Sequence, residues 1–242
     1  QIEGRRAEPR PRPPYPSEHG LHGCPTLINN VETLANVPAL ITRGAPWFAR
    51  RGSTHCPGTK VLSLAGHVRR PGVVEVPMGL SLRHVVMTLG GGAPEGGAVK
   101  AAHLGGPAGG SVPAALFDAP LDYDRLKALG AGLGSGGITV LGAQDSMVDL
   151  ARFFAGFCRR ESCGKCVPCR TGTVRMEELL GRIRDRAATP AELELLRELG
   201  TTLRQASLCG LGQNAPNPVL STLRFFPQEY AALLAKDGAS AP

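Results

Sequence analysis

Hydrophobic residues in the C-terminal part of the chain recur at the three- and four-residue spacing of amphipathic helices. One such helix is predicted from Ser146, which resembles the start of a capping box, and its apolar face holds Met147, Leu150, Ala151, Phe154 and Cys158. Further stripes predict helices around 176–183, after the start signal Thr189-Pro190-Ala191-Glu192, and near Pro218, with Pro227 breaking the last. Helices with such short connections are expected to form a small antiparallel bundle.

The central part of the chain has a different pattern. Partly alternating apolar positions predict strands at 61–65 and 72–76, a short helix after Ser81, and another strand at 98–104. A further short, buried strand is predicted at 138–141, after a glycine-rich connector. This order favours a small α+β module. The turn at 105–110 is rich in glycine but does not open a helix with G-x-G-x-x-G, so a nucleotide-binding role is not expected.

The N-terminal part is dominated by prolines between 5 and 16, which predict an extended segment, either an arm over another domain or a solvated linker. Asn30 is expected to cap a helix that carries Leu34, Val37 and Ile41. The amides of Asn29 and Asn30 suit the edge of a flavin ring or a phosphate, but they also suit a simple helix cap.

Composition narrows the possibilities. The 242 residues are 42% hydrophobic and 19% charged, as in globular proteins, and no apolar run predicts insertion into a membrane. The net charge of +7 comes with only 5% aromatic residues, and we interpret it as compensation for a negative site and a surface for acidic partners, not for nucleic acid. No export signal is visible, so a cytoplasmic location is predicted. The first residue is Gln1, and we expect a fragment of a longer protein.

Four cysteines form the strongest chemical signal. Cys163, Cys166 and Cys169 follow a C-x2-C-x2-C spacing, and Cys209 lies far along the chain. Three closely spaced thiolates and one distant one are typical of a [4Fe–4S] site. Zinc is the alternative, as the staple of a structural or docking module without redox activity, although its cysteine sites usually pair two C-x2-C motifs. The odd total of seven cysteines disfavours a disulfide framework.

Charged residues near the cysteine run have two interpretations. Arg159, Arg160, Lys165, Arg170 and Arg175 surround the run in sequence, where positive charge would favour a reduced cluster. Some of them, Arg159 and Arg175 in particular, could equally be solvated charges at helix ends. Cys158, on the apolar face of its helix, is predicted to be a core residue and not a fifth ligand.

Four segments together resemble one known family. They are ESCGKCVPCRTGT at 161–173, EPRPRPP at 8–14, PTLINNVET at 25–33 and SLCGLGQ at 207–213. The combination resembles the NADH-binding flavoprotein subunit of respiratory complex I and the diaphorase subunits of NAD-linked hydrogenases and formate dehydrogenases. The similarity extends over essentially the whole chain, and the tail at 214–223 is more similar to the hydrogenase and formate dehydrogenase branch.

This resemblance implies an α+β architecture. The end of a flavin-binding α/β domain at 1–57 would precede a ubiquitin-like β-grasp (SLBB) module at 58–112. A connector, with a strand that returns to the flavin domain, would occupy 113–143, and a C-terminal helical bundle holding the [4Fe–4S] cluster would occupy 144–242. By motif, Asn29, Asn30 and Thr33 resemble flavin-contacting positions, and the cluster ligands would be Cys163, Cys166, Cys169 and Cys209.

The resemblance also implies an NADH:acceptor oxidoreductase. In the full-length protein, FMN would take a hydride from NAD(H), and its electrons would pass singly through the cluster to partner subunits. Expected partners are a thioredoxin-like [2Fe–2S] subunit and a larger iron–sulfur, hydrogenase or formate dehydrogenase subunit. The family's glycine-rich segment that cradles the flavin phosphate has no equivalent in this chain. The chain alone is therefore expected to be inactive.

Overall fold

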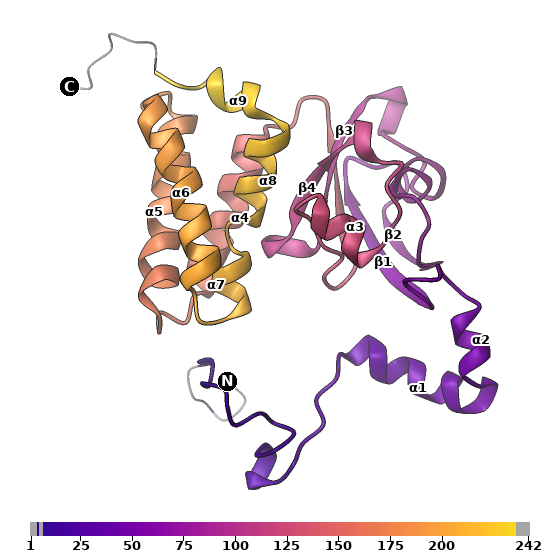
Figure 1. Cartoon of the computed structure of the whole chain (residues 1–242). Helices are drawn as coiled ribbons and strands as arrows, with labels where there is room; N and C mark the ends of the chain where they lie inside the picture. The colour runs from indigo at the N-terminus through magenta and orange to yellow at the C-terminus, as the bar shows by residue number, and fades with distance from the viewer. Residues whose placement is uncertain (1–3, 5–6, 236–242) are drawn as a thin grey trace.

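The computed structural model describes Gly4 and residues 7–235. Figure 1 shows three parts: an N-terminal arm, a domain built on a β-sheet, and a helical bundle beside the sheet. No helix among the described residues is both long enough and apolar enough to cross a membrane.

The arm contains little regular structure before its first helix. Residues 7–16 form neither helix nor strand, as the prolines predict, while 5 and 6 lie outside the described residues. A short turn, η1 (Leu21–Gly23), precedes α1 (Val31–Arg43) and α2 (Ala45–Ala49). Asn30 caps α1 as predicted. The apolar residues of α1 are not core, because Leu34 is 51% exposed and Ile41 is 78% exposed.

A five-stranded mixed sheet forms the central domain. Its strands are β1 (Thr59–Gly66), β2 (Gly72–Pro77), β3 (Val99–Leu104), β4 (Gly110–Pro113) and β5 (Gly137–Gly142), in the order β2-β1-β5-β3-β4. The first two strands form the predicted antiparallel hairpin. The connections hold η2 (His84–Leu89), η3 (Pro94–Gly96), η4 (Gly106–Ala108), η5 (Ala114–Leu116) and α3 (Tyr123–Ala128). Leu62, Leu82, Leu104 and Ile138 belong to the core on one face of the sheet.

Three details of this domain differ from the prediction. The resemblance had the strand at 138–141 returning to the flavin domain, but β5 lies between β1 and β3, because Ile138 and Val140 are buried in this core. The helix predicted after Ser81 is a π-helix, η2. Strand β4 was not predicted, since its four residues include a glycine and a proline, which are poor strand signals.

The bundle follows the helical periodicity. Its helices are α4 (Met147–Glu161), α5 (Val167–Arg184), α6 (Pro190–Ala206), α7 (Gly210–Asn214), α8 (Asn217–Phe225) and α9 (Pro227–Ala231). Ser146 caps α4, and Thr189 with Glu192 forms a complete capping box on α6, as predicted. The buried side chains between the helices include Met176, Leu180, Leu196, Leu203 and Tyr230.

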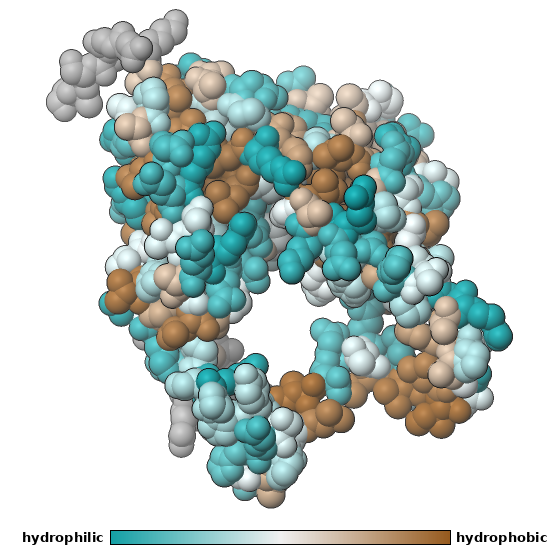
Figure 2. Space-filling view, viewed as in Figure 1, coloured by the Kyte–Doolittle hydropathy of each residue, from teal (hydrophilic) through white to brown (hydrophobic). Residues whose placement is uncertain are grey.

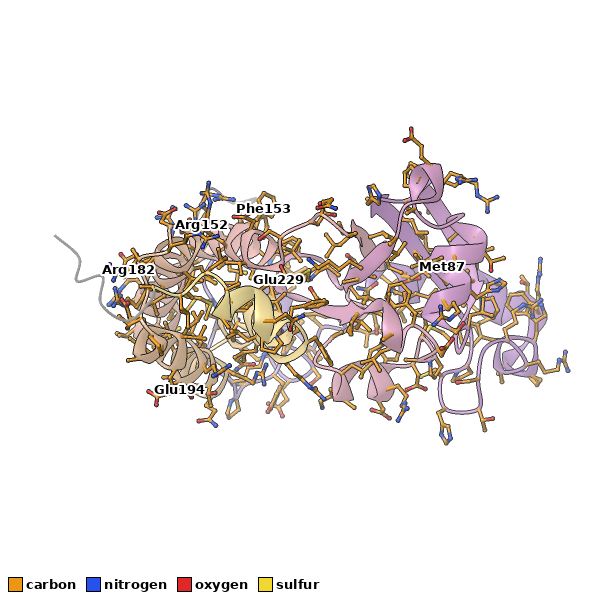
Figure 3. All side chains as sticks on the ribbon, turned by 90° about the horizontal axis from the view of Figure 1, so that it is seen from above. Met87, Arg152, Phe153, Arg182, Glu194 and Glu229 are labelled. Carbon is orange, nitrogen blue, oxygen red and sulfur yellow. The ribbon has the colours of Figure 1, made fainter. Side chains whose placement is uncertain are left out.

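Sheet and bundle meet along an interface with polar contacts at both ends. At the end near α9, Glu229 pairs with Lys100 of β3 at 2.7 Å and accepts the N–H of Met147 at 3.0 Å. Figure 3, viewed from above, shows Glu229 at this junction. Toward the opposite end, the ring of His103 stacks on that of Phe154 with centroids 4.2 Å apart. The sheet domain therefore supports the bundle along its length.

Buried His103 gives folding a pH dependence. Burial lowers its pKa from the ordinary 6.5 to about 4, although a bond to the Gly106 carbonyl acts the other way. The unfolded chain therefore binds a proton that the folded chain excludes, and stability falls as the pH drops through this window. We expect His103 to account for a loss of up to about 3 kcal/mol in the free energy of unfolding. Urea titrations of wild type and His103→Phe at pH 7 and pH 4 check this, and an equal loss in both proteins would contradict it.

Candidate metal centre

The three-cysteine run forms the loop between α4 and α5. Cys166 is the N-cap of α5, and Cys169 lies in its first turn, only 4% exposed. Gly164 has a φ of +76°, a left-handed conformation that allows the tight turn between the first two cysteines. The Ser162 hydroxyl accepts the Gly164 N–H at 3.3 Å and lies 3.2 Å from the Cys169 sulfur. This local network fixes the loop at the start of α5.

Cys209 belongs to a second loop at the same end of the bundle, between α6 and α7. It is the N-cap of α7, and the backbone N–H of the preceding Leu208 points at the sulfur of Cys166. Gly212 of α7 lies so close to the first loop that a Cβ there would be 2.9 Å from that of Cys169. The two cysteine loops are therefore in direct contact.

The thiols influence one another electrostatically. Burial raises the pKa of Cys169, the Ser162 hydroxyl lowers it, and the charges of Cys166, Cys209 and Cys163 raise it further. Burial also opposes the ionisation of Cys166, yet nearby backbone N–H groups and the charge of Arg170 leave its pKa below the ordinary value. The site thus lowers the pKa of one thiol through local donors, while the thiolates repel one another in the absence of positive charge.

This donor set fits an iron–sulfur cluster. A cubane binds each thiolate through a different iron, so its ligands stand farther apart than those of one ion. Within Gly4 and residues 7–235, no three His, Cys, Asp or Glu side chains are arranged to hold a single metal ion. The Ser207 hydroxyl, beside Gly212, is buried and has no hydrogen-bond partner among the described residues. A hydroxyl there can donate to a sulfur of a bound cluster.

The cations near the run separate into two groups. Lys165 donates to the Pro9 carbonyl at 2.9 Å, and Arg170 donates to the Gly164 carbonyl at 3.0 Å, so both hold the first loop or the arm against it. In contrast, Arg159 and Arg175 pair with Glu177 and Glu178 of α5. Because these two cations already have anionic partners, they fit the alternative of helix-surface charges.

Cys158 lies in the bundle core, 2% exposed, in agreement with its place on the apolar face of α4. Burial raises the pKa of its thiol to about 11, and the nearby Cys169 adds to the rise. A neutral thiol at this position is suited to packing and not to binding iron.

The three predicted flavin-contacting residues lie at the start of α1 and are exposed. The Asn30 side chain accepts the N–H of Glu32 at 2.9 Å, so its oxygen is used as a cap. Sequence reasoning missed Glu32, whose carboxylate pairs with buried Lys60 and accepts the N–H of Val61 at 2.9 Å. This contact ties α1 to β1. A glutamate in the first helical turn gave no signal beyond a favourable dipole interaction.

A cleft of about 980 Å³ separates the arm from the cysteine loops. The arm contributes Arg10, Arg12 and His19, and the bundle contributes Lys165, Cys209 and Gln213. Figure 2 shows the arm spanning an open space below the sheet domain and the bundle. The cleft thus brings positive charge next to a predicted cluster ligand. The sequence did not reveal it, because its two sides are far apart along the chain.

Comparison with known proteins agrees with this architecture. Residues 61–112 match the SLBB domain, and residues 149–233 match the NADH-ubiquinone oxidoreductase-F iron–sulfur binding region. The fold and the site therefore define an SLBB sheet joined to an iron–sulfur binding bundle. The chain belongs to the NADH-quinone oxidoreductase-F family, which includes related hydrogenase subunits, as the resemblance predicted.

Three relatives show the extent of the similarity. The NADP-reducing hydrogenase subunit HndC of Solidesulfovibrio fructosivorans is 47% identical over 96% of this chain and 47% of its own length. The NADH-quinone oxidoreductase-F protein of Mycobacterium bovis is 39% identical over 96% of this chain and 52% of its own length. A crystal structure of NAD+-reducing [NiFe]-hydrogenase in the H2-reduced state superposes with a TM-score of 0.86 at 35% identity, covering 96% of this chain and 39% of that one. The chain spans about half the length of the curated relatives it matches.

Proposed function

We propose that this chain holds a [4Fe–4S] cluster through Cys163, Cys166, Cys169 and Cys209 and relays electrons as part of an NADH-dependent oxidoreductase. When bound, the cluster supplies one-electron transfer. The residues of the chain bind it, shield it and set its environment. The backbone N–H of Leu208 and the charge of Arg170 stabilise negative charge on Cys166.

One observation carries the proposal: two loops far apart in sequence bring four thiols to one end of the bundle. The electrostatic effect of Cys163, Cys166 and Cys209 on Cys169 supports their proximity. Thiolates this close repel one another without positive charge between them, which a cluster supplies.

The cleft supports a site for the electron donor. Arg10, Arg12 and Lys165 line it, and it reaches Cys209. A phosphate-bearing donor such as FMN or NAD(H) suits this charge, and binding there would place it beside the cluster. Asn29, Asn30 and Thr33 would contribute the flavin contacts implied by the resemblance. FMN and NAD(H) would be bound by the longer protein.

The remaining parts of the proposal concern the assembly. The partners would be a thioredoxin-like [2Fe–2S] subunit and a larger iron–sulfur, hydrogenase or formate dehydrogenase subunit, since the relatives are named as parts of such oxidoreductases. The location would be the cytoplasm, and the chain by itself would have no NADH oxidation activity.

Anaerobic reconstitution with iron and sulfide tests the proposal. We expect about four irons and four acid-labile sulfides per chain, a brown colour, and an EPR signal on reduction with dithionite. A colourless protein that retains stoichiometric zinc and gives no reduced-cluster signal would instead establish the zinc-stapled module.

A further inference from the structure

The turn η4 of the SLBB sheet touches both segments of the bundle that lead to the cysteine loops. The turn connects β3 to β4 and consists of Gly106, Pro107 and Ala108. The sequence indicated only a glycine-rich connection here. In the structure it lies against α4 on one side and against the start of α8 on the other.

The first contact is with α4, which leads directly into the three-cysteine loop. The Cys158 thiol, in the last turns of this helix, donates a long, weak bond of 3.9 Å to the Pro107 carbonyl. One turn earlier, Phe154 stacks on His103 with the two rings inclined by 19°. These contacts fix the end of α4 from which Cys163 emerges.

The second contact is made by Asn217, the first residue of α8. Its amide donates to the Ala108 carbonyl at 3.1 Å and to the Asn214 side chain at 3.3 Å, and its oxygen accepts from Arg204 at 2.9 Å. Arg204 and Asn214 lie in α6 and α7, on either side of Cys209. One side chain therefore ties both flanks of the Cys209 loop to the turn.

His103 holds the turn from behind. Its ring is 1% exposed, and burial lowers its pKa to about 4, so the ring is neutral at neutral pH. The neutral ring can therefore use one nitrogen as a donor and the other as an acceptor, with Nε2 donating to the Gly106 carbonyl at 2.8 Å and Nδ1 accepting from the Ser111 hydroxyl at 3.0 Å. The Ser111 N–H donates to the Ser221 hydroxyl of α8 at 2.9 Å, within the same buried interface.

We propose that η4, held by His103, is a clamp that sets the separation of the two cysteine loops, with Asn217 as the positioning residue for the Cys209 side. The SLBB sheet thereby gains a role in the geometry of the metal centre, as the common support for two loops that reach it from different helices. This inference rests on the proposed function, because the clamp acts on the cluster through Cys163 and Cys209.

The test compares reconstituted full chains carrying His103→Phe, which keeps the stacking but removes both ring hydrogen bonds, and Asn217→Ala. Both variants should take up iron but give altered g values on reduction, a shifted midpoint potential, and cluster loss in air about tenfold faster or more, the usual effect of removing outer-shell support. Asn217→Asp keeps an acceptor for Arg204 but loses the donor to Ala108, so it should behave like Asn217→Ala.

Lys100→Met is the matched control, because Lys100 pairs with Glu229 across the same interface at the end away from the cysteine loops. It should leave the EPR signal and the cluster lifetime unchanged, even where it lowers thermal stability. If His103→Phe does not fold, Asn217→Ala carries the test, since Asn217 is only half-buried. Wild-type spectra and lifetimes in the folded clamp variants would overturn the clamp. A wild-type chain that takes up no iron would instead overturn the proposed function.

Discussion

Cys209→Ala is expected to cost the chain its four-iron cluster, or to leave a labile three-iron form. Cys209 is the one proposed ligand from the second loop, and the other three belong to a single loop at the start of α5. Removing it leaves one corner of a cubane without a protein ligand. Iron and sulfide analysis after anaerobic reconstitution, with EPR of the oxidised and the reduced protein, measures the result.

Cys158→Ala provides the comparison. Cys158 is equally close in sequence to the three-cysteine loop, but its thiol packs in the bundle core. We expect full iron loading and only a modest loss of stability, about 1 kcal/mol, from the missing sulfur. If this variant also empties the site, the assignment of the four ligands is wrong.

Gly212→Val is expected to disrupt the site by sterics alone. A Cβ at position 212 would lie 2.6 Å from that of Ser207 and 2.9 Å from that of Cys169, and both neighbours are fixed by their own helix ends. The branched side chain must push α7 away from α5, which separates the two cysteine loops. Overpacking of this kind costs about 1–3 kcal/mol of folding free energy, and cluster loading should fall sharply. Chemical unfolding and iron content together measure both effects.

The control for Gly212 is another helical glycine in the same bundle. A Cβ at Gly181 of α5 would meet only the Arg152 side chain, at 3.7 Å, an ordinary contact. Gly181→Ala should therefore load iron as the wild type does and gain up to about 1 kcal/mol of stability from helix propensity. Normal loading of Gly212→Val would show that the two loops do not need this close approach.

The bundle was predicted well because its signals are local. Ser146 caps α4, and Thr189 with Glu192 forms the capping box of α6, as their spacing indicates. Residues such as Leu196 and Leu203 repeat at helical spacing and are buried in the core. The β1–β2 hairpin followed from alternation over a short connection. In each case, the residues that carry the signal also make the contact.

Features that depend on distant segments were beyond sequence reasoning. The periodicity of α1 predicted a helix, but it does not say what lies against Leu34 or Ile41, and both are exposed. The position of β5 between β1 and β3 follows from pairing across the domain, not from its own residues. The contact of Gly212 with the three-cysteine loop, and the cleft beside Cys209, likewise join segments that are far apart along the chain.

The order of the strands also bears on aggregation during handling without the cluster. One edge of the sheet, β4, is bonded to α8 through Ser221, whereas the opposite edge, β2, has no neighbouring strand beyond it among the described residues. An open edge can recruit another polypeptide into intermolecular β-structure. Strand β2 is short, carries exposed Glu75 at its middle and ends at Pro77, which cannot donate a ladder bond. The chain should therefore resist fibril-like self-association through this edge even while its metal centre is empty.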